Sequence, residues 1–199
     1  MVSVILPAKN EGPNVKNTLD SFLESADAGN LQIIVVDDSS EDGCCDFMTA
    51  DGRYAEVLPV RAPGLGSSNA RNFGAQFAIG DVLVFADAHV KVPPTWVDGL
   101  LPFLDRYDCL SPAIKEMNGE TVGYGITVNE SYEMSWNGKL SDEPFSAAIN
   151  PGGFLMIRRD AFFAVGEWQK KFIVWGSEDN ELSIRLQLFG YRSAIVPGV

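Results

Sequence analysis

The sequence predicts an α/β fold with a mostly parallel central sheet, helices on both faces of that sheet, and a smaller antiparallel part in the second half. Short apolar runs rich in β-branched residues alternate with helix-like segments in the first half of the chain. This alternation favours parallel strands joined by helical crossovers. After residue 109 it stops, and apolar and polar residues alternate instead, which is typical of antiparallel strands.

Four segments of the first half are expected to be buried strands. They are short and almost wholly apolar: residues 2–8 (VSVILPA), 32–37 (QIIVVD), 56–60 (EVLPV) and 82–86 (VLVFA). Ligands of such sheets bind beyond the carboxyl ends of the strands. Polar residues follow three of these ends, in PAKNE, DDSS and DAH. The sequence therefore predicts one polar, mostly acidic crevice at that edge.

Three helices are expected between these strands. The first covers residues 13–26, where apolar side chains recur at helical spacing and Pro13 suits the first turn. The second begins near Glu41. The third covers residues 67–79 and follows the glycine-rich turn at 64–66. The free N–H groups at the start of this third helix can meet an anion.

The second half is expected to begin with antiparallel strands or a long excursion over the crevice, at residues 109–150. A strand, FLMI, and a helix-prone segment, RRDAFFAV, come next. Gly152 and Gly153 stand just before that strand. Paired glycines let a backbone approach a ligand closely, although a plain loop explains them equally well.

Composition narrows the classes of function. A chain of 199 residues with 46% hydrophobic content is expected to form a single domain. Its formal charge of −12 disfavours nucleic acids and anionic membranes as partners. No apolar stretch approaches the roughly 20 residues of a membrane span, so we expect a cytoplasmic protein. The three cysteines show neither a disulfide framework nor zinc-ligand spacing.

Asp87 and His89 are the candidate metal ligands. They follow the strand at 82–86 directly, and if the strand continues through them their side chains leave the same face. A carboxylate and an imidazole could then hold one divalent cation, which could carry a diphosphate. The alternative is a hydrogen-bonded histidine at a strand end beside an ordinary capping aspartate.

Asp38 and Arg71 are the candidate nucleotide ligands. Asp37 and Asp38 cannot both face the crevice, and Asp38 is preferred because it lies farther past the sheet, where it could accept hydrogen bonds from a base or ribose. The alternative is that residues 37–40 only cap the following helix. Arg71 lies one turn inside the third helix and could meet a diphosphate, or it could be solvated. The preceding turn misses the dinucleotide fingerprint, which disfavours a hydride-transferring enzyme.

A candidate general base lies in the segment WGSEDNEL at residues 175–182. Ser177 is the expected N-cap of a helix, so Glu178 and Asp179 would occupy its first turn. Acids there stabilise a helix by roughly 0.3 to 1 kcal/mol each, which alone could account for them. Trp175 just before them indicates an aromatic wall, and a carboxylate held there suits proton abstraction from a hydroxyl.

Taken together, VSVILPAKNEG, IIVVDDSSEDG, GLGSSNARNFGAQFAIGDVLVFADAH, GGFLMIRRDAF and WGSEDNELSIRLQLFGYR resemble a family 2 glycosyltransferase with a GT-A fold. The motifs occur in that family's order and span nearly the whole chain. DAH and WGSEDNEL are also similar to motifs of polypeptide N-acetylgalactosaminyltransferases and of β-1,4-galactosyltransferases.

The resemblance implies a nucleotide-sugar donor, usually a uridine diphosphate sugar, and Mn²⁺ or Mg²⁺ on its diphosphate. It implies a nucleotide-binding half at residues 1–108 and a half for donor sugar and acceptor at 109–199. It assigns metal and diphosphate to Asp87 and His89, the nucleotide to Pro7, Asn10, Glu11, Asp38 and Arg71, and sugar or acceptor to Gly152, Gly153, Trp175 and Glu178. Asp179 falls where inverting members keep the base.

Two departures limit what the resemblance implies. Many relatives have another metal ligand after the strand that is RSAIVP here, and none follows before Val199. A catalytic-domain fragment, a site completed by water and a weak metal site all remain open. Moreover, the polypeptide-modifying relatives retain anomeric configuration and typically have Asn where Asp179 lies.

Three functions remain open. The expected one is a metal-dependent glycosyltransferase of hexosyl or N-acetylhexosaminyl groups, inverting with Asp179 as base, and acting on an unknown glycan, lipid-linked sugar or peptide. A nucleotidyltransferase of similar fold is disfavoured because the segment after the first strand, PAKNEGPNVK, offers only Lys9 and Lys16 to hold a triphosphate. A non-catalytic nucleotide-sugar-binding domain is the third.

Overall fold

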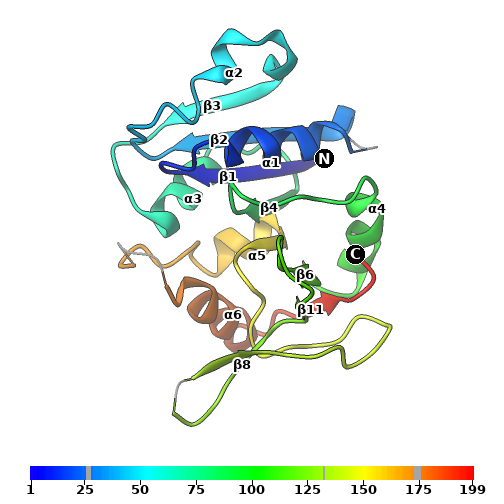
Figure 1. The fold of residues 1–199 in the computed structure, drawn as a ribbon. Coiled ribbons are helices and arrows are strands. Elements are labelled where there is room, and N and C mark those ends of the chain that lie inside the picture. The colour runs from blue at the N-terminus through cyan, green and yellow to red at the C-terminus, as the bar shows by residue number, and fades with distance from the viewer. Residues whose placement is uncertain (26–27, 132, 173–175) are drawn as a thin grey trace.

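The computed structural model describes residues 1–25, 28–131, 133–172 and 176–199. Its main element is a seven-stranded sheet with the order β11-β5-β10-β4-β1-β2-β3 (Figure 1). The strands are β1 (Val2–Ala8), β2 (Leu31–Asp37), β3 (Val57–Arg61), β4 (Val82–Ala86), β5 (Cys109–Pro112), β10 (Phe154–Arg158) and β11 (Ser193–Val196). The four strands predicted in the first half and the FLMI strand are confirmed, each within one residue of its predicted ends.

The first half of the sheet is parallel. β1 pairs with β2 and β4, and β2 pairs with β3, all in parallel. Both faces of β1 and β4 are covered, which explains why their sequences are continuous apolar runs and do not alternate. The carboxyl ends of β1, β2 and β4 lie at one edge, so the polar segments after them meet there.

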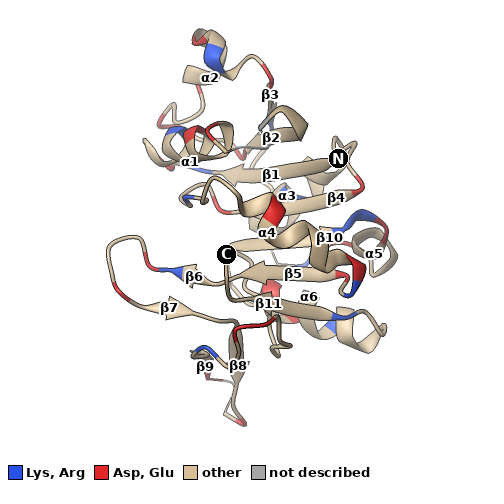
Figure 2. Cartoon of the chain, turned by 90° about the vertical axis from the view of Figure 1, so that its right-hand side faces the viewer, with Lys and Arg blue, Asp and Glu red and all other residues tan. Residues whose placement is uncertain are grey.

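β10 is the reversed strand of the sheet. It runs antiparallel to both β4 and β5, between which it lies (Figure 2). Phe154, its first residue, pairs with Ala86, the last residue of β4. An antiparallel strand starts where its neighbour ends, so the glycines before Phe154 lie beside Asp87. The sequence predicted this strand but not its direction.

Helices cover both faces of the sheet, as predicted. One core packs β1 and β4 side chains against α1 and α4, and the other packs the opposite face against α3, α5 and α6. The helices are α1 (Asn14–Leu23), α2 (Phe47–Ala50), α3 (Ser67–Ala75), α4 (Trp96–Leu100), α5 (Arg159–Ala164) and α6 (Glu178–Leu188), with short 3₁₀ turns at Ala28–Asn30, Gly52–Tyr54 and Leu101–Asp105.

The prediction of a helix beginning near Glu41 is wrong. The chain turns through residues 38–46, and α2 begins only at Phe47. Ser39 has a φ of 61°, which a right-handed helix cannot contain. The Asn10 side chain also holds this segment, because its Oδ1 accepts the N–H of Glu41 at 2.8 Å.

The neighbouring helices are shorter than predicted. α1 ends at Leu23, before the predicted end at residue 26, and α3 ends at Ala75, before residue 79. After α3 the chain turns toward β2, where the N–H of Ile79 donates to the Gln32 side chain at 2.9 Å. A contact with a distant strand thus replaces the last helical turn.

Ser177 occupies the predicted N-cap position of α6, but its side chain does not cap the helix. Ser177 precedes α6, but its φ is 66° and its side chain makes no capping hydrogen bond. The Glu178 carboxylate instead accepts the N–H of Gly176 at 2.7 Å. A side chain in the first turn of α6 therefore accepts a hydrogen bond from a backbone N–H that precedes the helix.

Two antiparallel hairpins confirm the predicted change of character in the second half. β6 (Ile114–Lys115) pairs with β7 (Val122–Gly123), and β8 (Ile126–Val128) pairs with β9 (Met134–Trp136). Both lie on the β11 side of the molecule (Figure 1). Among the described residues, no helix combines the length and apolar character needed to cross a bilayer.

Candidate functional site

A cavity of about 1040 Å³ lies where β4 ends and β10 begins. Its polar lining brings together seven of the residues predicted for the site: Arg71, Asp87, His89, Gly152, Gly153, Glu178 and Asp179. Segments far apart in sequence thus supply one site. Pro7, Asn10, Glu11 and Asp38 are not among its lining residues, and Trp175 lies outside the described residues.

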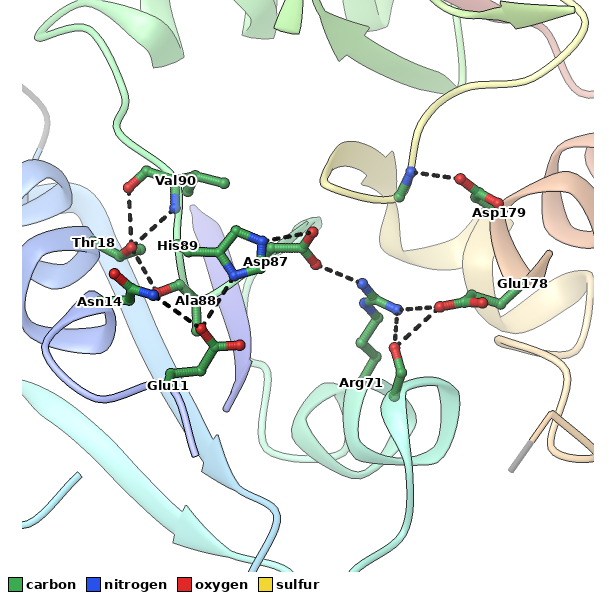
Figure 3. Close-up of polar contacts among 12 residues, drawn as sticks. Glu11, Asn14, Thr18, Arg71, Asp87, Ala88, His89, Val90, Glu178 and Asp179 are labelled. Carbon is green, nitrogen blue, oxygen red and sulfur yellow. Dashed lines mark hydrogen bonds and ion pairs between the residues drawn. The ribbon is translucent and has the colours of Figure 1, made fainter. Parts of the chain in front are cut away.

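Asp87 and His89 lie close together, although not by the predicted route. β4 ends at Ala86, and Ala88 and His89 form a turn instead of continuing the strand. The turn still brings Nε2 of His89 to 3.9 Å from Oδ2 of Asp87 (Figure 3). The expected proximity therefore arises from a turn and not from strand periodicity.

Thr18 holds this turn, a role that the sequence did not reveal. Its hydroxyl donates to the carbonyl of Ala88 at 2.9 Å and accepts the N–H of Val90 at 3.0 Å. Thr18 lies on the buried face of α1. A threonine among the apolar residues of an amphipathic helix is the one local signal of this anchor.

The two side chains suit a divalent cation. Bonds of about 2.1 Å to each atom would let one ion lie between a nitrogen and an oxygen up to about 4.2 Å apart. The separation of 3.9 Å falls within that limit, and both side chains reach solvent in the cavity. The described residues contain no group of three or more His, Cys, Asp or Glu able to hold a metal.

Arg71 lies between two carboxylates (Figure 3). Its guanidinium is 2.8 Å from Asp87 and 3.2 Å from Glu178, and it lies over the ring of Trp168 at 5.0 Å. Only 3% of Arg71 is exposed. The predicted solvated alternative is therefore excluded, and the arginine joins the end of β4 to the start of α6.

The Glu178 carboxylate accepts hydrogen bonds from several groups of the protein. Besides Arg71, its carboxylate accepts the hydroxyl of Ser67 at 3.1 Å and the N–H of Gly176. The residue is buried. Its negative charge is therefore compensated by donors of the protein itself.

Asp179 has a different environment. Its Oδ2 accepts only the N–H of Gly152, at a long 3.3 Å, and its Oδ1 accepts the N–H of Asn180 at 2.9 Å. No cation pairs with it among the described residues. The carboxylate is therefore the less compensated of the two in the cavity.

The paired glycines pack closely against Asp87 and Asp179. A Cβ on Gly152 would lie 3.3 Å from Cβ of Asp179, and a Cβ on Gly153 would lie 3.3 Å from Oδ2 of Asp87. Both distances are shorter than ordinary van der Waals contact. The backbone approaches Asp87 and Asp179 closely because side chains are absent, and contact of the two glycines with a ligand stays a prediction.

Asp38 binds the glycine-rich turn. Its two carboxylate oxygens accept the N–H groups of Leu65 and Gly66 at 2.6 and 2.8 Å. Asp37 turns the other way, to Arg61 at 2.9 Å. Asp38 is only 3% exposed. Direct contact of Asp38 with a nucleotide stays a prediction, whereas its support of the turn before α3 is observed.

Family models and curated proteins resemble this chain. The model of glycosyl transferase family 2 matches residues 3–166, and that of the N-terminal domain of galactosyltransferase matches residues 135–198. Polypeptide N-acetylgalactosaminyltransferase 8 of Drosophila melanogaster is 30% identical, over 98% of this chain and 36% of that protein. The chain thus spans about a third of the length of such relatives.

Solved structures share the fold. GalNAc-T7, crystallised with UDP, GalNAc and Mn²⁺, matches 99% of this chain and 42% of its own, with a TM-score of 0.85 and 25% identity. The mannosyltransferase PcManGT of Pyrobaculum calidifontis matches 100% of this chain and 55% of its own, with a TM-score of 0.76 and 23% identity. The model of glycosyl transferase family 2 matches well over half of the chain's 199 residues. The chain therefore belongs to glycosyl transferase family 2, and it has the GT-A fold.

Proposed function

We propose that this chain transfers a sugar from a nucleoside diphosphate donor to an acceptor hydroxyl, with a divalent cation at Asp87 and His89 and with Asp179 as the base. One observation carries the proposal. The two candidate metal ligands line a single cavity of about 1040 Å³ together with Asp179, which has no cationic partner among the described residues. That volume is at the upper end of the range for ligand sites.

Uridine diphosphate sugars are the preferred donors. The structure of GalNAc-T7 with UDP, GalNAc and Mn²⁺ matches nearly all of this chain. The polar segments after β1 and β2, with Asn10 and Asp38, and the turn before α3 then form the predicted nucleotide side of the site. The donor sugar would lie toward Gly152 and Gly153.

Mn²⁺ or Mg²⁺ is the proposed cation. Carboxylate, diphosphate and water oxygens suit these ions, and imidazole is compatible with Mn²⁺. When bound, the cation would neutralise charge on the departing diphosphate. The protein's part is to hold Asp87 through Arg71 and through the backbone of Gly153, whose carbonyl accepts the N–H of Asp87 at 3.0 Å.

The proposed reaction is a single displacement. The acceptor oxygen bonds to the anomeric carbon while the bond from that carbon to the diphosphate breaks, and its electron pair leaves with the diphosphate. The acceptor proton passes to Asp179, since Glu178 is compensated by Arg71. An in-line displacement inverts the anomeric configuration. The acceptor class stays open among a glycan, a lipid-linked sugar and a peptide.

A donor panel tests the proposal. UDP-GalNAc, UDP-GlcNAc, UDP-glucose and GDP-mannose would each be added with Mn²⁺ or with EDTA, and both the melting temperature and the release of free nucleoside diphosphate would be measured. We expect a stabilising shift with a UDP sugar and Mn²⁺, and slow donor hydrolysis. Binding without hydrolysis or transfer would favour the non-catalytic alternative. Pyrophosphate release from a nucleoside triphosphate and a sugar phosphate would favour the nucleotidyltransferase.

A further inference from the structure

We propose that Glu11 is a positioning residue that fixes the orientation and tautomer of His89. Oε2 of Glu11 lies 3.2 Å from Nδ1 of His89 (Figure 3). This role differs from the nucleotide contact that the family resemblance suggests for Glu11. The contact can be tested without a cation, and its consequence for cation binding rests on the proposed function.

The chemistry of the pair sets the direction of the hydrogen bond. An ionised carboxylate has only acceptors, so Nδ1 of His89 must be the donor. In a neutral imidazole the other nitrogen then carries the lone pair. That nitrogen, Nε2, is the one that lies 3.9 Å from Oδ2 of Asp87. Glu11 thus turns the metal-binding nitrogen of His89 toward the second candidate ligand.

The imidazole of His89 needs a hydrogen-bond partner because much of its surface is exposed to solvent. Its side chain is 53% exposed, whereas that of Glu11 is 23% exposed. An exposed ring on a turn can rotate and exchange its two nitrogens unless a hydrogen bond selects one state. Carboxylates that accept the second N–H of a metal-binding histidine perform this selection in many metal sites.

Glu11 is itself held in place. Nδ2 of Asn14, in the first turn of α1, donates to Oε2 of Glu11 at 3.4 Å. The backbone carbonyl of Glu11 accepts the N–H of Asn14 at 3.1 Å. α1 therefore supports the site at two points. Thr18 fixes the backbone of the turn after Asp87, and Asn14 holds Glu11, which in turn fixes the imidazole.

The chain allows an unusually direct test, because His89 is its only histidine. Nitrogen-15 NMR of the metal-free protein at alkaline pH would report one imidazole. We expect the Nδ1–H tautomer in the wild type and in Glu11→Gln, whose amide oxygen can still accept. In Glu11→Ala we expect a shift toward the Nε2–H form. An unchanged tautomer in Glu11→Ala would overturn the proposal.

Binding of Mn²⁺, followed by electron paramagnetic resonance, tests the consequence. Loss of such a partner typically weakens metal affinity about 10- to 100-fold, so we expect that weakening in Glu11→Ala and a smaller one in Glu11→Gln. Glu41→Gln is the matched control, because Glu41 is an exposed acid on the neighbouring loop. Equal affinity in Glu11→Ala and wild type would overturn the metal role of Glu11. Absence of Mn²⁺ binding in the wild type even when UDP is present would instead refute the proposed function.

Discussion

The backbone N–H of Asp87 donates to the carbonyl oxygen of Gly153 at 3.0 Å. This bond continues the antiparallel pairing of β4 and β10 one residue beyond the last paired residues. It fixes the position of a candidate metal ligand relative to the glycines that border the cavity. The close approach requires that residue 153 have no side chain, because a Cβ there would lie 3.3 Å from the Asp87 carboxylate.

Gly153→Ala should therefore weaken cation binding without unfolding the protein. Overpacking of this kind costs roughly 1 to 3 kcal/mol, and we expect part of that cost to displace the Asp87 carboxylate. Mn²⁺ titration and the melting temperature would be measured together. Gly29→Ala is the control, since a Cβ at that glycine meets nothing within 4 Å. Wild-type Mn²⁺ affinity in Gly153→Ala would contradict the proposed position of the ion.

Removal of either ligand should abolish the dependence of donor binding on the cation. Asp87→Asn removes the carboxylate charge and His89→Ala removes the imidazole, two groups whose atoms lie 3.9 Å apart in the wild type. We expect UDP-sugar affinity in Mn²⁺ to fall to the value that the wild type shows in EDTA. Calorimetric titration in both buffers measures this. Equal affinity of the wild type in EDTA and in Mn²⁺ would remove the metal role altogether.

Arg71 and Glu178 should be coupled in stability. Both are nearly fully buried, and removing one partner of such a pair typically costs about 3 to 5 kcal/mol. We expect Arg71→Met and Glu178→Met each to lower the free energy of unfolding by amounts of this order. The double variant should be more stable than the sum of the two losses predicts. Additive losses in urea unfolding would show that the pair is not coupled.

The edge of the sheet at which the site lies could be predicted because continuous apolar runs indicate strands buried on both faces. Asp87, His89 and Asp179 do line one cavity there. The bridge through Arg71 could not be predicted, because it joins residues 107 positions apart in sequence. It depends on how α6 packs against α3, which no local pattern encodes. The contact of Thr18 with the turn after Asp87 could not be predicted for the same reason, since its partners lie 70 and 72 residues away.

Asp38 should control nucleotide binding through the turn that it holds. Asp38→Ala leaves the N–H groups of Leu65 and Gly66 without their acceptors, so we expect the turn to relax and UDP affinity to fall. Titrations of UDP, GDP and CDP would be compared in the variant and the wild type, and we expect the wild type to prefer UDP. Unchanged UDP affinity in Asp38→Ala would refute the nucleotide assignment. Equal affinities for the three nucleotides would refute the uridine preference.

Asp179→Asn should stop transfer while leaving UDP binding nearly intact. An amide cannot accept the acceptor proton, and loss of a general base typically lowers the rate about 10²- to 10⁴-fold. The neighbouring Glu178 cannot readily substitute, because adjacent residues on a helix point about 100° apart and its carboxylate is bound to Arg71. Asp105→Asn, an exposed aspartate elsewhere, is the control for loss of one charge.

The product decides between the two stereochemical courses. With Asp179 as base on the side opposite the leaving diphosphate, an α-linked donor should give a β-linked product, which NMR of the purified product distinguishes. The family resemblance implies that polypeptide-modifying members retain configuration and typically have an amide at this position. A carboxylate is thus the feature expected to separate this chain from them. An α-linked product would show that the chain retains configuration, and near-normal turnover in Asp179→Asn would show that Asp179 is not the base.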